Sequence, residues 1–337
     1  MWAADWHRFC GAMPLPLLVV RPVVTAADRP RAADALGCSG ETACAARPAE
    51  LRCSPWWSCA PRLKARRLEI ELGYRLAAVR REAAEDERLS LLEQLYDPVS
   101  RRRRALVEQG WRCLEVGAGR GSMAVWLAEQ VGPAGQVVVT DIDTRYLQRL
   151  DLPNLEVLEH NILDDSLEVL GPGSFDLVCS RLTLFHLVGR QEVAIRQMTE
   201  CLRPGGWLID EDADWGTAAP IDPSHSLYDG YQRVWRNGDW WTSRGYDKAF
   251  GQKLPALFER CGLQDIRHEA ATEVVRGGSP WARWWAVTLE VINELGGARE
   301  SDQRELEVMT SALADPTVWI LRELLHACWG RRVGEAR

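Results

Sequence analysis

Short apolar runs alternate with segments of helical composition through the middle of the chain. The run at residues 136–142 is nearly continuous in apolar character, and strands are also expected at 114–116, 175–181 and 207–212. Such runs are typical of parallel strands that are buried on both faces. Parallel strands require crossover connections, which are usually helices that cover the sheet. The pattern therefore predicts an α/β fold with helices on both faces of a mostly parallel sheet.

Two helices are predicted before the first of these strands. Residues 76–95 are rich in Ala, Glu, Arg and Leu, and Asp97 with Pro98 ends this segment, because proline disrupts a helix interior. A second helix is expected at residues 99–109. Its run of four arginines, 101–104, is interpreted as a solvated helix face.

Tryptophan gathers in the last third of the chain, where nine of the sixteen lie from Trp215 onward. Most fall in two predicted insertions, at about 213–250 and 276–315, the second of them helical. One hypothesis is a cap that forms a lid over a substrate site, with Trp240 and Trp241 among the contacts, since aromatic walls suit an apolar or planar ligand. The alternative is that these side chains fill the core of the cap or a dimer interface.

The segment 114–122, LEVGAGRGS, indicates a ligand site at a strand-to-helix turn. Glycine-rich turns of this kind expose backbone N–H groups at a helix N-terminus, and both dinucleotides and S-adenosylmethionine bind there. A dinucleotide site favours a third glycine where this chain has Ser122. Glu115 would repel a pyrophosphate and would suit the ammonium group of S-adenosylmethionine.

Asp141 stands at the end of the second predicted strand, 22 residues after Gly119. An acid in this place can accept hydrogen bonds from both hydroxyls of a ribose. Asp143 is a second candidate, although it should already enter the following helix at residues 144–150. The structural alternative for Asp141 is an N-cap of that helix.

Polar side chains also follow the later strands. Ser180, Arg181 and His186 come at or after the end of run 175–181, and ligands of open α/β sheets bind outside the carboxyl ends of the strands. His186 is a candidate base, or alternatively a capping side chain. Glu211, Asp212 and Asp214 crowd the end of the next strand, as a substrate contact (Asp212 foremost) or as solvated loop acids.

Composition narrows the class of protein. The 337 residues are 46% hydrophobic with a net charge of −7, which argues against nucleic acid as the main partner. No apolar run approaches the roughly 18 residues of a membrane helix. We therefore expect a cytoplasmic protein, monomeric or homodimeric, that acts on a small molecule.

The first 67 residues differ from the rest, with a net charge of +5 and five of the ten cysteines. They lack helix or strand periodicity, and we expect a disordered or non-native extension of a domain that spans 68–331. Cys38, Cys44, Cys53 and Cys59 have five, eight and five residues between them, wider than the usual spacing of zinc ligand pairs, so no metal site is predicted. The other five cysteines are expected to be buried thiols.

Five blocks together resemble the class I S-adenosylmethionine-dependent methyltransferases. They are LEVGAGRGS (114–122), VVVTDID (137–143), LEVLEHNILDD (155–165), FDLVCSRLTLFHL (175–187) and LRPGGWLIDED (202–212). Their order and spacing are those of the ubiquinone-biosynthesis-like small-molecule group, methyltransferase type 11/12, in its actinobacterial form. The resemblance implies a Rossmann-like seven-stranded sheet with an antiparallel last strand, a helical Trp-rich cap, and S-adenosylmethionine as cofactor.

The resemblance also implies roles for individual residues. The methionine moiety would contact Glu115, Gly117, Ala118 and Gly119, and the ribose would contact Asp141. The remaining implied cofactor contacts are Ile142, Asn161, Ile162 and Ser180, and the tentative substrate contacts are Arg181, His186, Asp212, Trp240 and Trp241. Asn161 stands where the family usually has Asp, so hydrogen bonding to adenine would lack charge assistance.

The expected reaction is in-line methyl transfer to an acceptor O, N or C atom, with His186 as a tentative base. Two alternatives remain open on the residues. An NAD-dependent oxidoreductase is disfavoured by Ser122, Glu115 and the lack of a recognisable Tyr-x-x-x-Lys pair. A non-catalytic S-adenosylmethionine-binding regulator would carry the same glycine turn.

Overall fold

The computed structural model describes residues 82–237, 245–296 and 300–334. The predictions for the first 67 residues, and those for Trp240 and Trp241, therefore lie outside the described residues. None of the helices in the described ranges has the length and hydrophobicity needed to cross a membrane.

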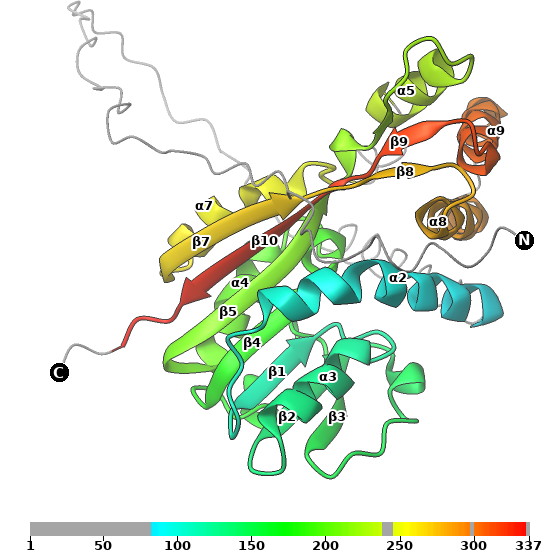
Figure 1. Cartoon of the computed structure of the whole chain (residues 1–337). Helices are drawn as coiled ribbons and strands as arrows, with labels where there is room; N and C mark the ends of the chain where they lie inside the picture. Colours follow the sequence, from blue (N-terminus) through cyan, green and yellow to red (C-terminus); the bar gives the residue numbers. More distant parts are fainter. Residues whose placement is uncertain (1–81, 238–244, 297–299, 335–337) are drawn as a thin grey trace, which may run out of the picture.

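Helices and short strands surround one large sheet (Figure 1). The helices are α2 (Glu82–Arg103), α3 (Ser122–Val131), α4 (Gln191–Cys201), α5 (Tyr228–Asn237), α7 (Leu254–Arg260), α8 (Pro280–Gly296) and α9 (Glu300–Ala314). The strands of the large sheet are β1 (Arg112–Val116), β2 (Gln136–Asp141), β3 (Leu155–Glu159), β4 (Phe175–Arg181), β5 (Leu202–Asp214), β7 (Gln264–Ala271) and β10 (Leu324–Arg331).

The seven strands lie in the order β3-β2-β1-β4-β5-β10-β7. Strands β1 to β5 pair in parallel, and β10 is antiparallel to both β5 and β7. This arrangement confirms the predicted mostly parallel sheet with an antiparallel last strand. Because β10 enters between β5 and β7, the last strand in sequence is not at the edge.

Alternate residues of the strands face two separate hydrophobic cores. Val137 and Val139 pack with Leu127 of α3 on one face, whereas Val138 packs with Met198 of α4 on the other. The alternation follows from the period of two along a strand. It explains why the central strands are apolar at nearly every position.

A smaller sheet accompanies the cap helices. Its strands β6 (Ala219–Pro220), β9 (Trp319–Leu321) and β8 (Val274–Arg276) pair antiparallel. In Figure 1 they lie with α5, α8 and α9 at one end of the molecule. The sequence predicted helices in the second insertion, which α8 and α9 confirm, but it did not predict this sheet.

The four tryptophans Trp215, Trp281, Trp284 and Trp285 form a buried aromatic cluster. Trp215 stacks on Trp284 with ring centroids 5.7 Å apart. Burial of this extent favours the core interpretation for these four side chains over the lid interpretation.

Helix α2 corrects the prediction of two helices. It is continuous from Glu82 to Arg103, with Pro98 in its interior. Pro98 is exposed, and its missing N–H costs the helix one backbone hydrogen bond. Tertiary contacts of Asp97, Ser100 and Arg103, described below, hold the C-terminal part of α2 and compensate for that loss.

The arginine run at 101–104 is only half solvated. Arg101 and Arg102 are exposed, but Arg103 and Arg104 are buried. The prediction of a solvated face was therefore wrong for the second pair. The reason is a buried partner, Glu211, which no local pattern reveals.

All five cysteines of the described residues, Cys113, Cys179, Cys201, Cys261 and Cys328, are buried free thiols. This confirms the expectation for the cysteines that follow residue 67.

Candidate cofactor site

The glycine turn lies at the carboxyl ends of β1 and β2. Gly117, Gly119 and Gly121 all have positive φ, of 73°, 58° and 83°, a backbone region that favours glycine. The N–H groups of Gly117 and Ala118 both donate to the carbonyl of Thr140, at 2.8 and 3.1 Å. The turn is thus fixed to the end of β2 before it opens into α3.

Crowding at Gly117 leads to a testable prediction. A Cβ there would lie 2.3 Å from Oγ1 of Thr183. Gly117→Ala should therefore destabilise the fold by about 2–3 kcal/mol, because strain from the left-handed backbone adds to the displacement of Thr183.

The matched control is Gly189→Ala, whose φ of 72° is similar but whose Cβ would meet nothing within 4 Å. We expect it to cost only about 1–2 kcal/mol from the backbone. Urea unfolding of both variants measures the difference, and equal losses would show that Thr183 does not constrain the turn.

Asp141 connects the turn to the end of β2. Its Oδ2 accepts from the N–H of Gly119 at 2.9 Å, and its Oδ1 accepts from the N–H of Asp143 at 3.0 Å. Burial raises the pKa of the Asp141 carboxyl above its ordinary value, against these hydrogen bonds. The capping role considered for Asp141 belongs to Asp143, which accepts from the N–H of Arg145 at the start of the short helix η3 (Thr144–Tyr146).

That short 3₁₀ helix replaces the longer helix expected at residues 144–150. Ile142 lies between the two acids and is half-buried. The orientation of the Asp141 carboxylate is thus set by two backbone N–H groups at the carboxyl end of β2.

Glu115 is the most unusual polar group at the turn. The residue is only 4% exposed, and its Oε2 has no hydrogen-bond partner among the described residues. Burial raises the pKa of Glu115 to about 7, although Arg181 and Arg104 lower it. A buried carboxylate oxygen without a donor fits a cationic ligand group, such as the ammonium of a methionine moiety.

Asn161 and Ile162, the residues expected near the adenine, contact neighbouring residues of the protein. Asn161 donates from its side chain to Asp164 at 3.2 Å and accepts from the N–H of Leu163 at 3.0 Å. Ile162 is buried and belongs to the core on the α4 face. The structure therefore shows Asn161 closing its own turn and Ile162 packing in the core.

Ser180 and Asp212 face the protein interior. The hydroxyl of Ser180 donates to the carboxylate of Asp210, and both residues are fully buried. Asp212 accepts from the N–H of Phe185 at 2.8 Å, and burial raises its pKa to about 7. The geometry thus does not support the predicted cofactor contact of Ser180 or substrate contact of Asp212, and it corrects the picture of Asp212 as a possible solvated loop acid.

His186 ends the short helix η5 (Leu184–His186) that follows β4. It is exposed, and its ring lies edge-on to Phe185 and Tyr246, with centroids 5.5 and 6.3 Å away. Phe185 in turn stacks on Tyr246 at 5.0 Å and meets Trp215 edge-on at 6.1 Å. An aromatic cluster therefore follows the carboxyl end of β4, with Phe185 and Trp215 buried and His186 at its exposed edge.

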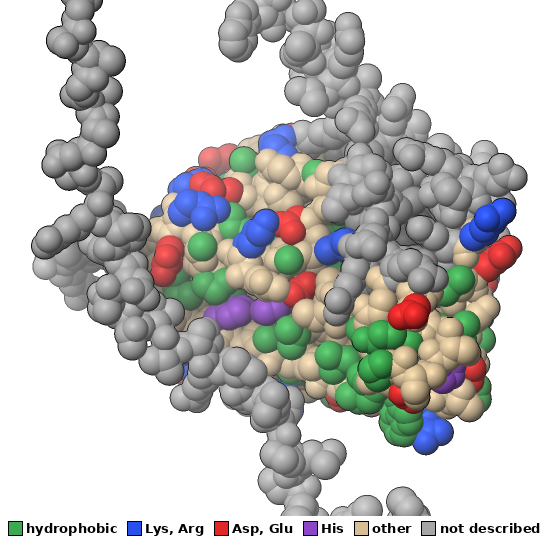
Figure 2. Space-filling view, turned by 90° about the horizontal axis from the view of Figure 1, so that it is seen from above, with side chains coloured by type: hydrophobic (Ala, Val, Ile, Leu, Met, Phe, Trp, Pro, Cys, Tyr) green, Lys and Arg blue, Asp and Glu red, His purple; other side chains and the backbone are tan. Residues whose placement is uncertain are grey.

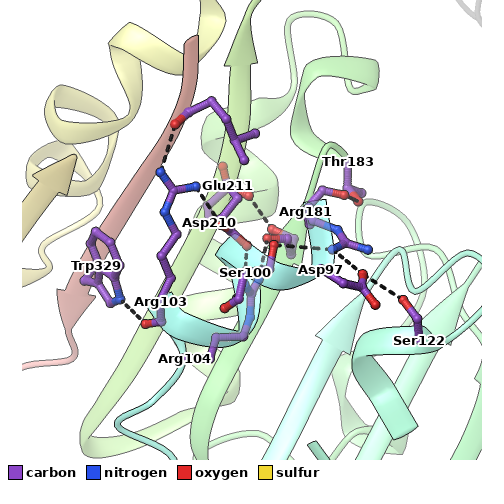
Figure 3. Close-up of polar contacts among 12 residues, drawn as sticks. Asp97, Ser100, Arg103, Arg104, Ser122, Arg181, Thr183, Asp210, Glu211 and Trp329 are labelled. Atoms are coloured by element: carbon purple, nitrogen blue, oxygen red, sulfur yellow. Dashed lines mark hydrogen bonds and ion pairs between the residues drawn. The ribbon is translucent and has the colours of Figure 1, made fainter. Parts of the chain in front are cut away.

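Helix α2 is bound to the same region through polar contacts (Figure 3). Arg181 donates from Nη1 to Oδ1 of Asp97 at 2.8 Å and to the hydroxyl of Ser100 at 3.3 Å. The hydroxyl of Ser122 donates to the same Oδ1 of Asp97 at 3.0 Å. Sequence reasoning missed Asp97, because an acid beside a proline resembles a helix end.

A second set of contacts lies further along α2. Arg103 donates to Glu211 at 2.8 Å and to Glu269 at 2.7 Å, and Arg104 also pairs with Glu211. Seen from above the view of Figure 1, the described surface carries charges of both signs among hydrophobic side chains (Figure 2). Glu211 is thus an internal partner of α2 rather than a substrate contact.

The central part of the chain is similar to known methyltransferases. Residues 114–210 match the family model described as a methyltransferase domain. Methyltransferase str3 of Strobilurus tenacellus is 31% identical over 150 residues, which cover 44% of this chain and 51% of that protein. The chain thus spans about half the length of that relative.

Two further proteins are similar. The ubiquinone/menaquinone biosynthesis C-methyltransferase UbiE of Cupriavidus taiwanensis is 29% identical over 176 residues, covering 48% of this chain and 71% of that protein. The solved YcgJ protein of Bacillus subtilis has a TM-score of 0.42 and 16% identity, covering 69% of this chain and 96% of that one. The match to the methyltransferase domain model thus begins at the glycine turn and extends through β4 into β5.

Proposed function

We propose that the protein transfers the methyl group of S-adenosylmethionine to a small-molecule acceptor. The observation that carries the proposal is the unpartnered carboxylate oxygen of Glu115, buried beside the glycine turn. A group of this kind is costly without a ligand, because its desolvation is not compensated. Asp141 at the end of β2 provides the second polar anchor, for the ribose.

Bound S-adenosylmethionine supplies an activated methyl group on a sulfonium, so the residues of this chain chiefly bind, orient and exclude water. As the bond from the methyl carbon to the acceptor forms, the carbon–sulfur bond breaks and its electron pair stays on sulfur. The acceptor is an O, N or C atom. Where that atom carries a proton, we propose exposed His186 as the base.

The acceptor side of the site is proposed to lie at the edge of the aromatic cluster after β4, where His186 is exposed and Tyr246 is half-buried. Phe185, His186 and Tyr246 are in mutual ring contact there. Aromatic side chains at the wall of a site bind planar or apolar molecules well, since they bury large areas and stack. This supports a small molecule with an apolar body as the acceptor.

Calorimetric titration with S-adenosylmethionine, S-adenosylhomocysteine and NAD tests the proposal. We expect the first two to bind and NAD not to bind. Binding of NAD alone would contradict the proposal and favour an oxidoreductase. Methyl transfer to any member of a small-molecule panel would separate an enzyme from a non-catalytic regulator.

The pKa of Glu115 makes a specific prediction about pH. Because this carboxyl titrates near 7 in the free protein and must be ionised to accept from an ammonium, binding should release protons. Affinity for S-adenosylhomocysteine should therefore rise as the pH increases from 6 to 7.5. Proton release is measured from the dependence of the binding enthalpy on the buffer.

Glu115→Gln is the matched variant. It should lower affinity about tenfold to a hundredfold, the value of a charge-assisted hydrogen bond, and should remove the proton release. The amino group of the ligand titrates alike with both proteins, so the difference isolates Glu115. An unchanged pH dependence in the variant would assign the titration to another group.

A further inference from the structure

Arg181 is the last residue of β4, the strand that pairs with β1 next to the glycine turn. In the pairing of β1 with β4, Glu115 lies opposite Cys179 and Val116 opposite Ser180. Arg181 is two residues beyond Cys179, so it shares a face of the sheet with Glu115. A carboxylate and a guanidinium therefore lie diagonally across two neighbouring strands at their carboxyl ends.

The backbone after Arg181 is strained. Leu182 has a φ of 52° and is one of two non-glycine residues with positive φ among those described. A leucine in this region is rare, and such strain gathers at functional sites. The hydrogen bond from the N–H of Leu182 to the carbonyl of Glu211, at 2.7 Å, holds the turn and with it the end of β4.

Arg181 already binds a carboxylate in this structure. Its side chain is 8% exposed, and Nη1 donates to Asp97 at 2.8 Å. The hydroxyl of Ser122, the first residue of α3, donates to the same carboxylate oxygen. The first turn of α3 contains no acidic residue of its own, so Asp97 is an anion from α2 placed near a helix N-terminus, where anions are favoured.

The chemistry of this arrangement matches an α-amino acid group. Glu115 has a buried oxygen without a partner among the described residues, suited to an ammonium. Arg181 and Ser122 together donate to a carboxylate. The methionine moiety of the cofactor carries both charges on one carbon, so the two halves of the site would be filled by one ligand.

We propose that Arg181 and Ser122 bind the carboxylate of the cofactor's methionine moiety, and that Asp97 occupies this subsite in the free protein. The inference rests on the proposed function, since it assumes that cofactor. On binding, the ligand carboxylate replaces Asp97, which retains Arg101, its other partner on α2 at 3.1 Å. Helix α2 thereby responds to the occupancy of the site.

The test compares two ligands that differ in the amino-acid group. S-adenosylhomocysteine has the carboxylate, and 5′-methylthioadenosine lacks the whole amino-acid group. Calorimetry with Arg181→Gln should show a loss of roughly tenfold to a hundredfold in affinity for the first and little change for the second. Because the affinities of the same variant for the two ligands are compared, a general loss of stability would weaken both and would not produce this result.

Asp97→Asn tests the replacement. Removing the competing charge should tighten binding of S-adenosylhomocysteine about threefold to tenfold and leave 5′-methylthioadenosine unchanged. The control is Arg101→Gln, which removes an exposed partner of Asp97 and should change neither affinity by more than about twofold.

Two results would overturn this inference and leave the proposed function standing. They are an equal loss of both ligands in Arg181→Gln, or weaker binding of S-adenosylhomocysteine in Asp97→Asn, while the wild type binds both ligands. If the wild type binds neither ligand, the proposed function fails and this inference fails with it. The wild-type titration therefore distinguishes the two failures.

Discussion

Replacing Asp141 with alanine should lower the affinity for S-adenosylmethionine by about a hundredfold or more. Its carboxylate is oriented by the N–H groups of Gly119 and Asp143, which leaves lone pairs for both ribose hydroxyls. Each charge-assisted hydrogen bond is worth about 1.5–3 kcal/mol, and the variant loses two of them together with the acceptor that positions the glycine turn. Calorimetry at pH 7.5 measures the loss.

Asp143→Ala is the control for this experiment. Asp143 is two residues away and caps η3 through the N–H of Arg145 at 3.3 Å. Losing that cap should cost about 1 kcal/mol of stability with less than about threefold change in affinity. If the two variants lost affinity equally, the loop would matter as a whole and Asp141 would have no special contact with the ribose.

Glu211→Gln should destabilise the fold by about 3–5 kcal/mol, because it leaves the buried guanidinium of Arg104 without its counter-ion and Arg103 with only the more exposed Glu269. Arg103 and Arg104 both pair with this carboxylate, and all three side chains are at most 1% exposed. Denaturant unfolding measures the loss. The contact fastens α2 to β5, so the variant should also loosen the helix that bears Asp97.

Glu269→Gln is the matched control, since Glu269 also pairs with Arg103, at 2.7 Å, but is 36% exposed. An exposed pair is worth at most about 1 kcal/mol. Similar losses in the two variants would argue that burial of Glu211 adds nothing to the pair.

The same carboxyl predicts a dependence of stability on pH. Burial by itself would raise the pKa of Glu211, but Arg104 and Arg103 outweigh it and lower the pKa to about 2. The group is thus more acidic in the folded state than in the unfolded one. Its stabilisation is complete above about pH 4.5 and is lost as the pH falls toward 2. Between pH 5 and 3, the wild type should lose stability more steeply than Glu211→Gln.

Local pattern was sufficient for the large sheet and the cofactor turn. A strand buried on both faces must be apolar at successive positions, and a turn with positive φ needs glycine, so β1, β2, β4 and the turn at Gly117 to Gly121 leave a direct signal in the sequence. The acid at the end of β2 follows from the same local geometry. These features predict both the α/β fold and the class of ligand.

The face of the sheet to which a strand residue points alternates along the strand. This alternation gave wrong expectations where both faces of the sheet are buried. Arg181 shares a face with Glu115, whereas Ser180 points to the opposite core and binds Asp210. Asp212 likewise faces inward and accepts from Phe185. An apolar strand gives no contrast between its faces, so sequence placed Ser180 and Asp212 at the site along with Arg181.

What the sequence by itself determined is therefore the sheet, the glycine turn and the type of cofactor, because each depends on backbone conformation or on neighbours within one strand. Only the tertiary structure decided that α2 passes through Pro98 without a break, that Arg103 and Arg104 are buried, and that Asp97 reaches Arg181. These depend on pairs far apart in the chain: Arg104 and Glu211 are 107 residues apart, and Asp97 and Arg181 are 84 apart. The energy of such ion pairs comes from burial, and burial is a property of the assembled fold.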